Sequence, residues 1–340
     1  WGLPHVFAVF LIVAASGALN IASISSVFGK TAYKPLAPLS TLLALALLAG
    51  GLMVLVLDLG RPDRLIVAMT QYNFKSIFAW NMILYNGFFA IVGIYMWTMM
   101  QRSMNKYSKI AGFSAFIWRL MLTTGTGSIF GFLVSRQAYD AAIMAPMFIV
   151  MSFSFGLAIF LLVVMASYKW TDRPLGDATF NRLKNLLGVF VAGVLYFVIA
   201  QHLTNLYATE HHGVEAFILR DGGIYTNMFW YGQIILGSLI PLAIIYHPAT
   251  AGSRSAISVA SILIILGGLA QMYVIIIGGQ AYPLELFPGK EVSSSFFDGM
   301  VNAYKPTLAE GLLGLGGFAV SLFMVAFAVK VLRFLPESLA

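Results

Sequence analysis

The sequence contains no cysteine among its 340 residues. Without a thiolate, the chain cannot form a disulfide, a thiolate metal site or an iron–sulfur cluster of its own. Charged residues are also scarce, at 10% of the chain, whereas they make up about a quarter of an ordinary soluble domain. This scarcity excludes a soluble domain with a basic face, so we expect no nucleic-acid partner.

Hydrophobic residues account for 60% of the chain. They gather in stretches of about twenty, long enough to cross roughly 30 Å of hydrocarbon as a helix. We therefore predict an all-α membrane protein in a lipid bilayer, with nine transmembrane helices. The predicted spans are residues 5–28, 36–58, 77–100, 112–134, 142–168, 185–208, 226–246, 255–278 and 308–333.

The connections between spans carry unequal charge. One side of the membrane is assigned one set of alternate connections, the C-terminus and Arg119, and this side has thirteen of the 20 Lys and Arg residues. The other connections have the remaining seven. Acidic residues divide the other way, with three beside the thirteen and ten beside the seven. By the positive-inside rule, we predict a cytoplasmic C-terminus and an N-terminus on the outer side.

The stretch LDLGRPDRL, residues 57–65, places four charges at the outer end of a long apolar run. In a structural interpretation, Asp58 binds backbone N–H groups or pairs with Arg61, while Gly60 and Pro62 end the helix. In a functional interpretation, Asp and Arg form the polar end of a pocket whose apolar end lies between helices. Ionisable groups at membrane depth favour the functional interpretation as a hypothesis.

These residues resemble a known family. The LDLGRP element, followed by YNFKSIFAWN leading into the next span, is similar to the NrfD/PsrC family of polysulfide reductase membrane subunits. The opening WGLPHVFAVFLIVAASGA resembles the first span of that family. The later YVIIIGGQAYPL and YKPTLAEGLLGLGG resemble the end of its longer members, including those of Dsr-type complexes.

The resemblance implies two four-helix bundles without a prosthetic group, docked to an iron–sulfur (ferredoxin-like) subunit and exchanging electrons with a quinone. It also implies a catalytic subunit such as a molybdopterin enzyme or a multihaem cytochrome, and a bacterial or archaeal cytoplasmic membrane. We expect residues 1–140 to form the first bundle, residues 141–280 the second, and residues 281–340 an outer loop with an extra helix. We hypothesise that the outer lip, which is the stretch LDLGRPDR, and Lys75 dock the iron–sulfur partner.

The exchangeable ligand we expect is menaquinone or ubiquinone, with no haem or iron–sulfur cluster in this chain. A transmembrane b-type haem needs two His residues that face each other, and of the five His only His5 and His202 fall within predicted spans. Some longer family members have a His in the fourth span, where this chain has Thr123 and Thr124. We expect the glycines of that span to allow close helix contact.

A quinone site needs donors for two carbonyl groups, a residue that exchanges protons, and apolar walls. The outer ends of the first four spans offer each type, and an imidazole such as that of His5 titrates near neutral pH. We expect no metal ligand. The predicted catalytic residues are His5, Asp58, Tyr139 and Asp140; the predicted quinone-binding residues are His5, Arg61, Arg64, Trp80, Phe130, Arg136 and Tyr139.

Each candidate also has a structural interpretation, as an interfacial His, a belt aromatic or a snorkelling Arg. Polar residues in the second half, such as Gln201, His202, Asn205 and Gln271, indicate either a proton path or hydrogen bonds between helices. Two other functions stay open. One is a secondary transporter or ion-translocating protein, whose site would lie near the midplane, and the other is a membrane anchor without a redox role.

Overall fold

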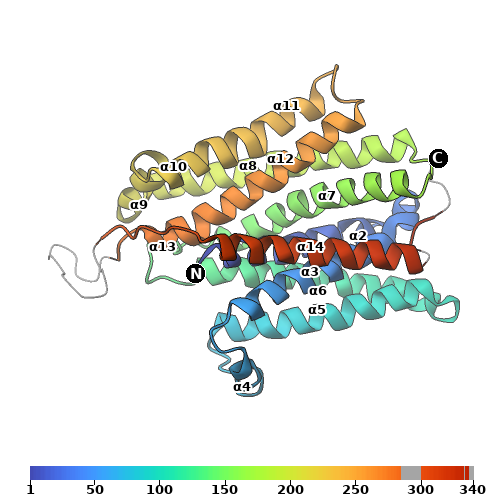
Figure 1. The fold of residues 1–340 in the computed structure, drawn as a ribbon, viewed down its shortest axis with the longest axis horizontal. Coiled ribbons are helices and arrows are strands. Elements are labelled where there is room, and N and C mark those ends of the chain that lie inside the picture. Colours follow the sequence, from blue (N-terminus) through green and yellow to red (C-terminus); the bar gives the residue numbers. More distant parts are fainter. Residues whose placement is uncertain (285–299, 333, 337–340) are drawn as a thin grey trace.

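The computed structural model describes residues 1–284, 300–332 and 334–336. Throughout this part of the chain the regular structure is helical, without a β-strand. Figure 1 shows the long helices lying side by side along the longest axis of the molecule. Eight helical stretches are long and apolar enough to cross a membrane, so the prediction of an all-α membrane protein is confirmed.

The long helices follow the predicted spans closely. In chain order they are α1 (Leu3–Ala18) with α2 (Asn20–Ser26), α3 (Ala37–Asp58), α5 (Ile77–Met100), α6 (Ser108–Gly131), α7 (Met144–Trp170), α8 (Asp177–Tyr207), α10 (Ile224–Asn227) with η6 (Met228–Leu239) and α11 (Ile240–Tyr246), α12 (Arg254–Tyr273) with η7 (Val274–Gly278) and α13 (Gly279–Ala281), and α14 (Leu308–Val331). The predicted span 112–134 coincides with α6. This helix is not among the eight, because Arg119 and a run of Thr, Ser and Gly lower its hydropathy.

Short helices complete the connections. They are η1 (Thr31–Leu36), η2 (Pro62–Arg64), α4 (Leu65–Thr70), η3 (Arg102–Tyr107), η4 (Thr209–His211), α9 (His212–Ala216) and η5 (Phe217–Asp221). One boundary differs from the sequence expectation. Helix α8 begins at Asp177, eight residues before the predicted start, because the segment 177–184 is amphipathic and buries Phe180 and Leu183.

Helix α1 lies at the centre of the molecule and contacts α3, α6, α7, α12 and α14. One group of helices comprises α1, α3, α5 and α6, and the other comprises α7, α8, η6 with α11, and α12. The two groups share a seam between α1 and α7, where a Cβ on Gly17 or Gly156 would overlap the backbone of the facing helix. The division into two bundles and three chain regions remains a prediction, because this seam is as extensive as the packing within a group.

Helix α14 packs on α1 and α3 rather than on the second group. A capping box starts it, since Thr307 and Glu310 each bind the other's backbone N–H. Further along, the Ser321 hydroxyl donates to the Ala46 carbonyl at 3.0 Å. The extra helix of the sequence prediction therefore supports the two helices that carry His5 and Asp58.

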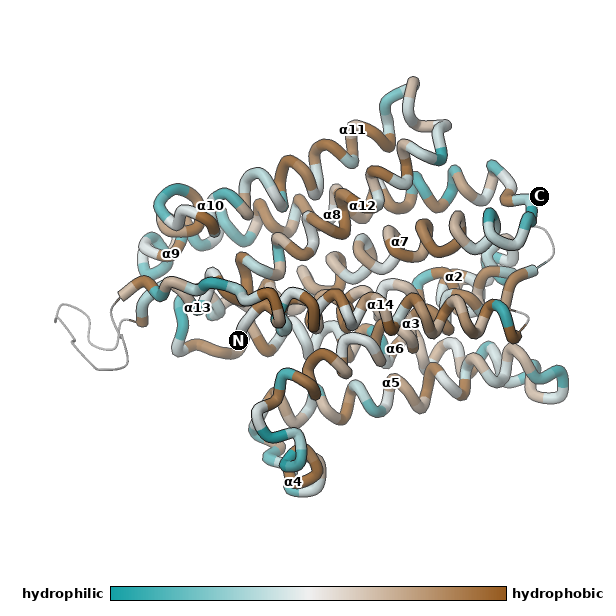
Figure 2. The backbone as a smooth tube through the Cα atoms, in the orientation of Figure 1, coloured by the Kyte–Doolittle hydropathy of each residue, from teal (hydrophilic) through white to brown (hydrophobic). Residues whose placement is uncertain are grey.

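Polar residues collect at the two ends of the helices, and hydrophobic residues occupy the length between them, as Figure 2 shows. The connection containing α4 and that containing α9 lie at one end of the molecule, and the C-terminus lies at the other (Figure 1). We call the first end, where Trp1 also lies, the outer end. Which end faces the cytoplasm remains a prediction. Two of the Lys and Arg residues counted for that prediction, Lys290 and Arg333, lie outside the described residues.

Arg119 does not belong with the charges of the connections, where the sequence count placed it. It lies 11 residues after the start of α6 and is buried, with 3% of its surface exposed. Its guanidinium donates to the Ser16 carbonyl at 3.2 Å and to the Asn20 side chain, and it lies between the rings of Phe116 and Phe153. Backbone and amide dipoles together with two aromatic faces stabilise this charge inside the helix packing.

Candidate functional site

A cavity of about 400 Å³ lies among α1, α3, α5 and α6, toward the outer end. A volume of this size is within the usual range for a site that binds a small organic molecule. From His5 to Ile12 its wall follows α1 for seven residues, which corresponds to about 10 Å of helix. Most of the wall is aliphatic or aromatic, so the cavity suits a largely apolar ligand.

Two ionisable groups meet at the edge of this cavity. His5, in the first turn of α1, lines it, and His5 Nδ1 lies 3.0 Å from Oδ2 of Asp58, the last residue of α3. The atoms lack the alignment of a hydrogen bond, so the contact is electrostatic. About a quarter of each side chain is exposed, 26% for His5 and 27% for Asp58. Water therefore reaches a titratable pair beside an apolar chamber.

The partner of Asp58 differs from both sequence interpretations of the lip. Among the described residues, its ion-pair partner is His5, not Arg61. Helix α3 ends at Asp58 itself, since Leu59 adopts an extended conformation, and Pro62 begins η2 instead of only ending a helix. The turn after α3 therefore carries Arg61 away from Asp58, while α1 brings His5 to it.

Aromatic rings surround the outer part of the cavity. The Trp1 ring centroid lies 5.7 Å from that of Phe130, 5.9 Å from that of Phe78 and 6.2 Å from that of His5. Trp1, Phe78 and Phe130 all line the cavity. The sequence analysis predicted that Phe130 and Trp80 both bind the quinone. Of these two, Phe130 lines the cavity.

Helix α5 supplies polar groups that the sequence analysis missed. Asn81, Tyr85 and Asn86 line the cavity. The Asn81 amide donates to the Ile77 and Gly125 carbonyls, both at 2.9 Å, and so joins α5 to α6. The signal was present in the sequence, because Asn81 and Tyr85 are four residues apart and share one face of an otherwise apolar helix.

Tyr139 and Arg136 come together, although not on one helical face. Helix α6 ends at Gly131, where a Cβ would crowd the Ala141 carbonyl, and residues 132–143 form turns. The Tyr139 hydroxyl donates to the Ile276 carbonyl at 2.6 Å, and Arg136 donates to the Gln280 carbonyl at 2.9 Å. Tyr139 therefore fastens the turn to η7, and Arg136 fastens it to α13.

The Tyr139 phenol is 1% exposed, and it lies behind Trp1 and Phe130 rather than in the cavity wall. Burial raises the pKa of this phenol far above its usual value, against the opposing effect of the Arg136 charge. The phenol therefore stays protonated at any working pH and keeps its proton in the hydrogen bond to the Ile276 carbonyl.

The remaining predicted residues lie elsewhere. Trp80 is 46% exposed, and its indole N–H donates to the Phe74 carbonyl at 2.9 Å. Arg61, Arg64 and Asp140 are exposed, and the cavity lining includes none of them. Their predicted roles at the ligand remain untested.

The segment 59–76, which contains η2 and α4, projects away from the helices (Figure 1). Its apolar side chains are exposed as well as its charged ones, with Ile66 70%, Val67 58% and Phe74 62% exposed. Leu65 and Met69 of the same segment line the cavity. The segment therefore joins a mixed apolar and basic surface to the cavity wall.

His202, the other His within a predicted span, pairs with a carboxylate. It contacts Glu215, with His202 Nδ1 2.7 Å from Glu215 Oε2. Within the described part of the chain, no three His, Asp or Glu residues are grouped closely enough to hold a metal ion. Near the fourth-span position, the Thr123 hydroxyl donates to the Arg119 carbonyl at 2.9 Å, and Gly127 packs against Met144 and Ala145.

Comparison with known proteins identifies relatives over nearly the whole chain. The chain is 28% identical to the Hdr-like menaquinol oxidoreductase integral membrane subunit of Archaeoglobus fulgidus, over 99% of this chain and 85% of the relative. It is 24% identical to a selenate reductase subunit of Mesobacillus selenatarsenatis, over 96% and 84%. It is 26% identical to a putative dimethyl sulfoxide reductase membrane subunit of Halobacterium salinarum, over 99% and 83%.

A family model also matches, and it agrees with the resemblance seen in the sequence. The model is described as polysulphide reductase, NrfD, and it matches residues 1–283. That range includes α1 to α13, and with them the whole lining of the cavity. This multi-pass membrane protein therefore belongs to the NrfD polysulphide reductase family.

Proposed function

We propose that the chain is the quinone-interacting membrane subunit of a respiratory oxidoreductase, exchanging electrons between the quinone pool and an iron–sulfur partner at the outer face. The observation that carries this proposal is the 400 Å³ apolar cavity with the His5–Asp58 pair at its edge. A quinone has the matching chemistry, because it combines a polar ring with an isoprenoid tail. The names of the three relatives, a menaquinol oxidoreductase subunit and two reductase subunits, support the same class.

The His5–Asp58 pair gives the reaction its proton acceptor or donor. Oxidation of a quinol to a quinone releases two electrons and two protons. His5 uses Nδ1 toward Asp58, which leaves Nε2 for a quinol hydroxyl or a quinone carbonyl. Asp58 stabilises the imidazolium that forms when His5 takes a proton. The exposed quarter of each side chain lets water exchange that proton.

The electrons leave through a partner, since the chain has no Cys to hold an iron–sulfur cluster. The segment 59–76 is the proposed docking surface. It combines exposed apolar side chains with Arg61, Arg64 and Lys75, and it also contributes to the cavity wall. A partner with an acidic rim around an apolar centre would complement it.

The test is quinol-dependent turnover of the purified complex. Asp58→Asn removes the charge beside His5 and should lower quinol-dependent turnover by at least ten-fold, while the activity of the catalytic partner with a soluble dye is unchanged. Asp172→Asn is the matched control, because Asp172 is an exposed carboxylate in the connection between α7 and α8, outside the proposed docking surface and the cavity lining. Equal turnover in the Asp58 variant, the Asp172 variant and the unmodified complex would exclude the His5–Asp58 pair from quinone chemistry. A labelled quinone analogue should bind to the purified complex and be displaced by quinol. A passive anchor would not bind it.

A further inference from the structure

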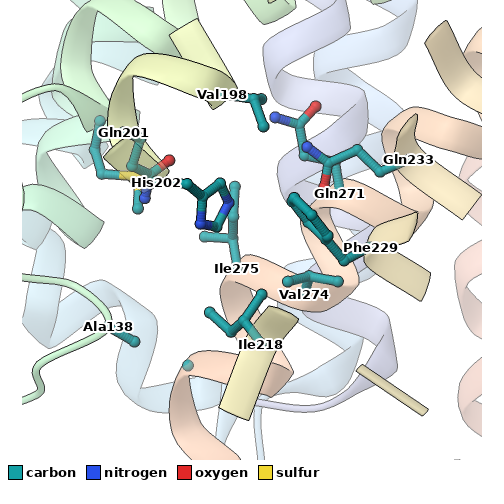
Figure 3. A pocket seen from close by; sticks show the side chains of 12 residues that line it. Ala138, Val198, Gln201, His202, Ile218, Phe229, Gln233, Gln271, Val274 and Ile275 are labelled. Carbon is teal, nitrogen blue, oxygen red and sulfur yellow. Dashed lines mark hydrogen bonds between the residues drawn. The ribbon is translucent and has the colours of Figure 1, made fainter. Parts of the chain in front are cut away.

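A second, smaller cavity lies in the other group of helices, between α8, η6 and η7. It encloses about 30 Å³, and Figure 3 shows its lining with the imidazole of His202 pointing into it. Residues from three π-helical segments, η5, η6 and η7, meet here: Ile218, Phe229 and Val274 are examples. Wide helical turns of this kind are rare and often occur at functional sites.

The cavity is suited to water rather than to an organic ligand. A buried water needs about 10–15 Å³, so the space holds about two. Amide side chains line it, from Gln201, Gln233 and Gln271. Gln271 is 2% exposed, and its Nε2 has no hydrogen-bond partner among the described residues. The rest of the wall is mostly apolar, so a buried amide donor without a protein partner beside a space of this size indicates an ordered water as its acceptor.

Glu215 lies next to this cavity and is fully buried, with a side-chain exposure of 0%. Its Oε2 lies 2.7 Å from His202 Nδ1, and its Oε1 accepts a hydrogen bond from Asn205 at 2.8 Å. His202 also packs its ring against Phe229, with the centroids 4.7 Å apart. One imidazole therefore connects a sealed carboxylate on one side with the water-sized space on the other.

The charge of this carboxylate needs compensation. Within the described residues, no Lys or Arg forms an ion pair with Glu215, and His202 is its only partner that can carry a positive charge. A carboxylate buried without a counter-charge is strongly unfavourable. One added proton makes the pair neutral, either as imidazolium with carboxylate or as imidazole with carboxylic acid.

Other titratable groups lie on the elements packed against the pair, but their charges are engaged elsewhere or exposed. The Glu210–His211 contact is 3.6 Å long, and Arg220 and Asp221 are bonded to each other at the surface. The other titratable groups on the packed elements are His212, Tyr225, Tyr231, Arg254 and Tyr273, and those on α8 itself are Asp177, Arg182, Lys184, Tyr196 and Tyr207.

We propose that His202 and Glu215 form a proton-binding site that exchanges its proton with water in the adjoining cavity. Binding adds one proton and raises the net charge of the pair by one, and nothing is oxidised or reduced. A void of about 10 Å³ beside the cavity shares Gln233 and Gln271 with it and adds the hydroxyls of Ser154 and Ser238. These groups extend the polar path toward the middle of α7 and η6.

The test uses infrared difference spectra of the membrane-embedded complex between about pH 5 and 8, the range in which an imidazole titrates. No quinone is added, so a negative result leaves the proposed function intact. We expect a protonation step with imidazole and carboxyl bands that shift in deuterium oxide. His202→Asn should remove the imidazole bands and Glu215→Gln the carboxyl bands, because the new side chain keeps a polar group in place but cannot bind the proton. Glu210→Gln, which changes an exposed neighbour, should leave them unchanged.

Spectra of the two variants that match the unmodified protein would overturn the proposal, because a purely structural pair would not titrate. A measurement on the unmutated chain covers the case in which a variant does not fold. With ¹⁵N-labelled histidine, one of the five imidazoles should show a strongly hydrogen-bonded Nδ1 and titrate in the same pH range. Absence of such a signal would equally exclude the site.

Discussion

Two of the His–carboxylate pairs among the described residues border cavities, in different surroundings. His5–Asp58 is separated by 3.0 Å, with about a quarter of each side chain exposed, and it borders a cavity of about 400 Å³. His202–Glu215 is separated by 2.7 Å, has a fully buried carboxylate that also binds Asn205, and borders a cavity of about 30 Å³. The chemistry of the pairs is the same, so the surroundings determine which ligand each serves.

The first surroundings are mostly apolar and large enough for an organic ring, which favours a lipid-soluble reactant. The second include three amide side chains and are too small for an organic ring, which favours a proton alone. Variants that change the imidazole, the cavity, the carboxylate or the supporting contacts can therefore test whether the two pairs differ in this way.

The largest effect is expected at the first imidazole. His5→Gln keeps a polar side chain but removes proton exchange, and quinol-dependent turnover should fall by about 100-fold, a typical contribution of general acid–base catalysis. Steady-state assays of the complex with quinol and with a soluble dye measure this effect. His212→Gln, at an exposed imidazole in a connection, is the control. If both variants retain full turnover, the first pair has no catalytic role.

The next largest effect is expected when the volume of the large cavity is reduced. Ile129 lines the large cavity on α6, and Ile129→Trp should fill part of it and raise the KM for quinol by at least ten-fold. Ile117→Trp places the same ring on the same helix at a site that is 42% exposed, and it should leave the KM unchanged. Equal KM values in the two variants would show that the ligand binds elsewhere.

The two carboxylates should differ in their contributions to stability. Glu215→Ala leaves Asn205 and His202 without their buried partner and should lower the free energy of unfolding by about 1–3 kcal/mol. Asp58→Ala should cost under about 1 kcal/mol, since its pair is partly exposed and water replaces the lost contact. Thermal unfolding in detergent measures both. A larger loss at Asp58 than at Glu215 would contradict the contrast in burial.

The smallest effect is expected at the contact between the turn after α6 and η7. Tyr139→Phe removes the hydrogen bond to the Ile276 carbonyl and should cost about 1 kcal/mol, with a change of only a few-fold in the KM for quinol. Tyr207→Phe, at a side chain that is 92% exposed, should change neither quantity. A loss of turnover as large as that in His5→Gln would instead make Tyr139 part of the reacting site.

The sequence predicted the helices well because each depends on a local property, the length of an apolar run. The same runs placed the candidate residues at one end of the molecule. Which side chains meet there depends on how the helices pack, and no local pattern encodes that. Asp58 therefore contacts His5 from another helix, and the half-exposed Trp80 binds the Phe74 carbonyl instead of lining the cavity.

Three further differences have separate physical causes. Arg136 and Tyr139 bind the carbonyls of Gln280 and Ile276 instead of lining the cavity, because α6 ends at Gly131 and both residues lie in the turn that follows. Arg119 is buried because its charge finds dipoles and aromatic rings inside the packing. Glu215 reaches His202 because η4 and α9 fold the connection back onto α8, a long-range arrangement that spacing alone does not reveal.

The segment η7 forms a partition between the two cavities, since Ile275 lines the small cavity and its neighbour Ile276 lines the large one. Two side chains hold this partition through one atom, because the Ile276 carbonyl accepts from the Tyr139 hydroxyl at 2.6 Å and from Gln280 Nε2 at 2.7 Å. One carbonyl thus carries the contacts that hold the wall shared by the two cavities, and loss of either donor would loosen that wall on both sides.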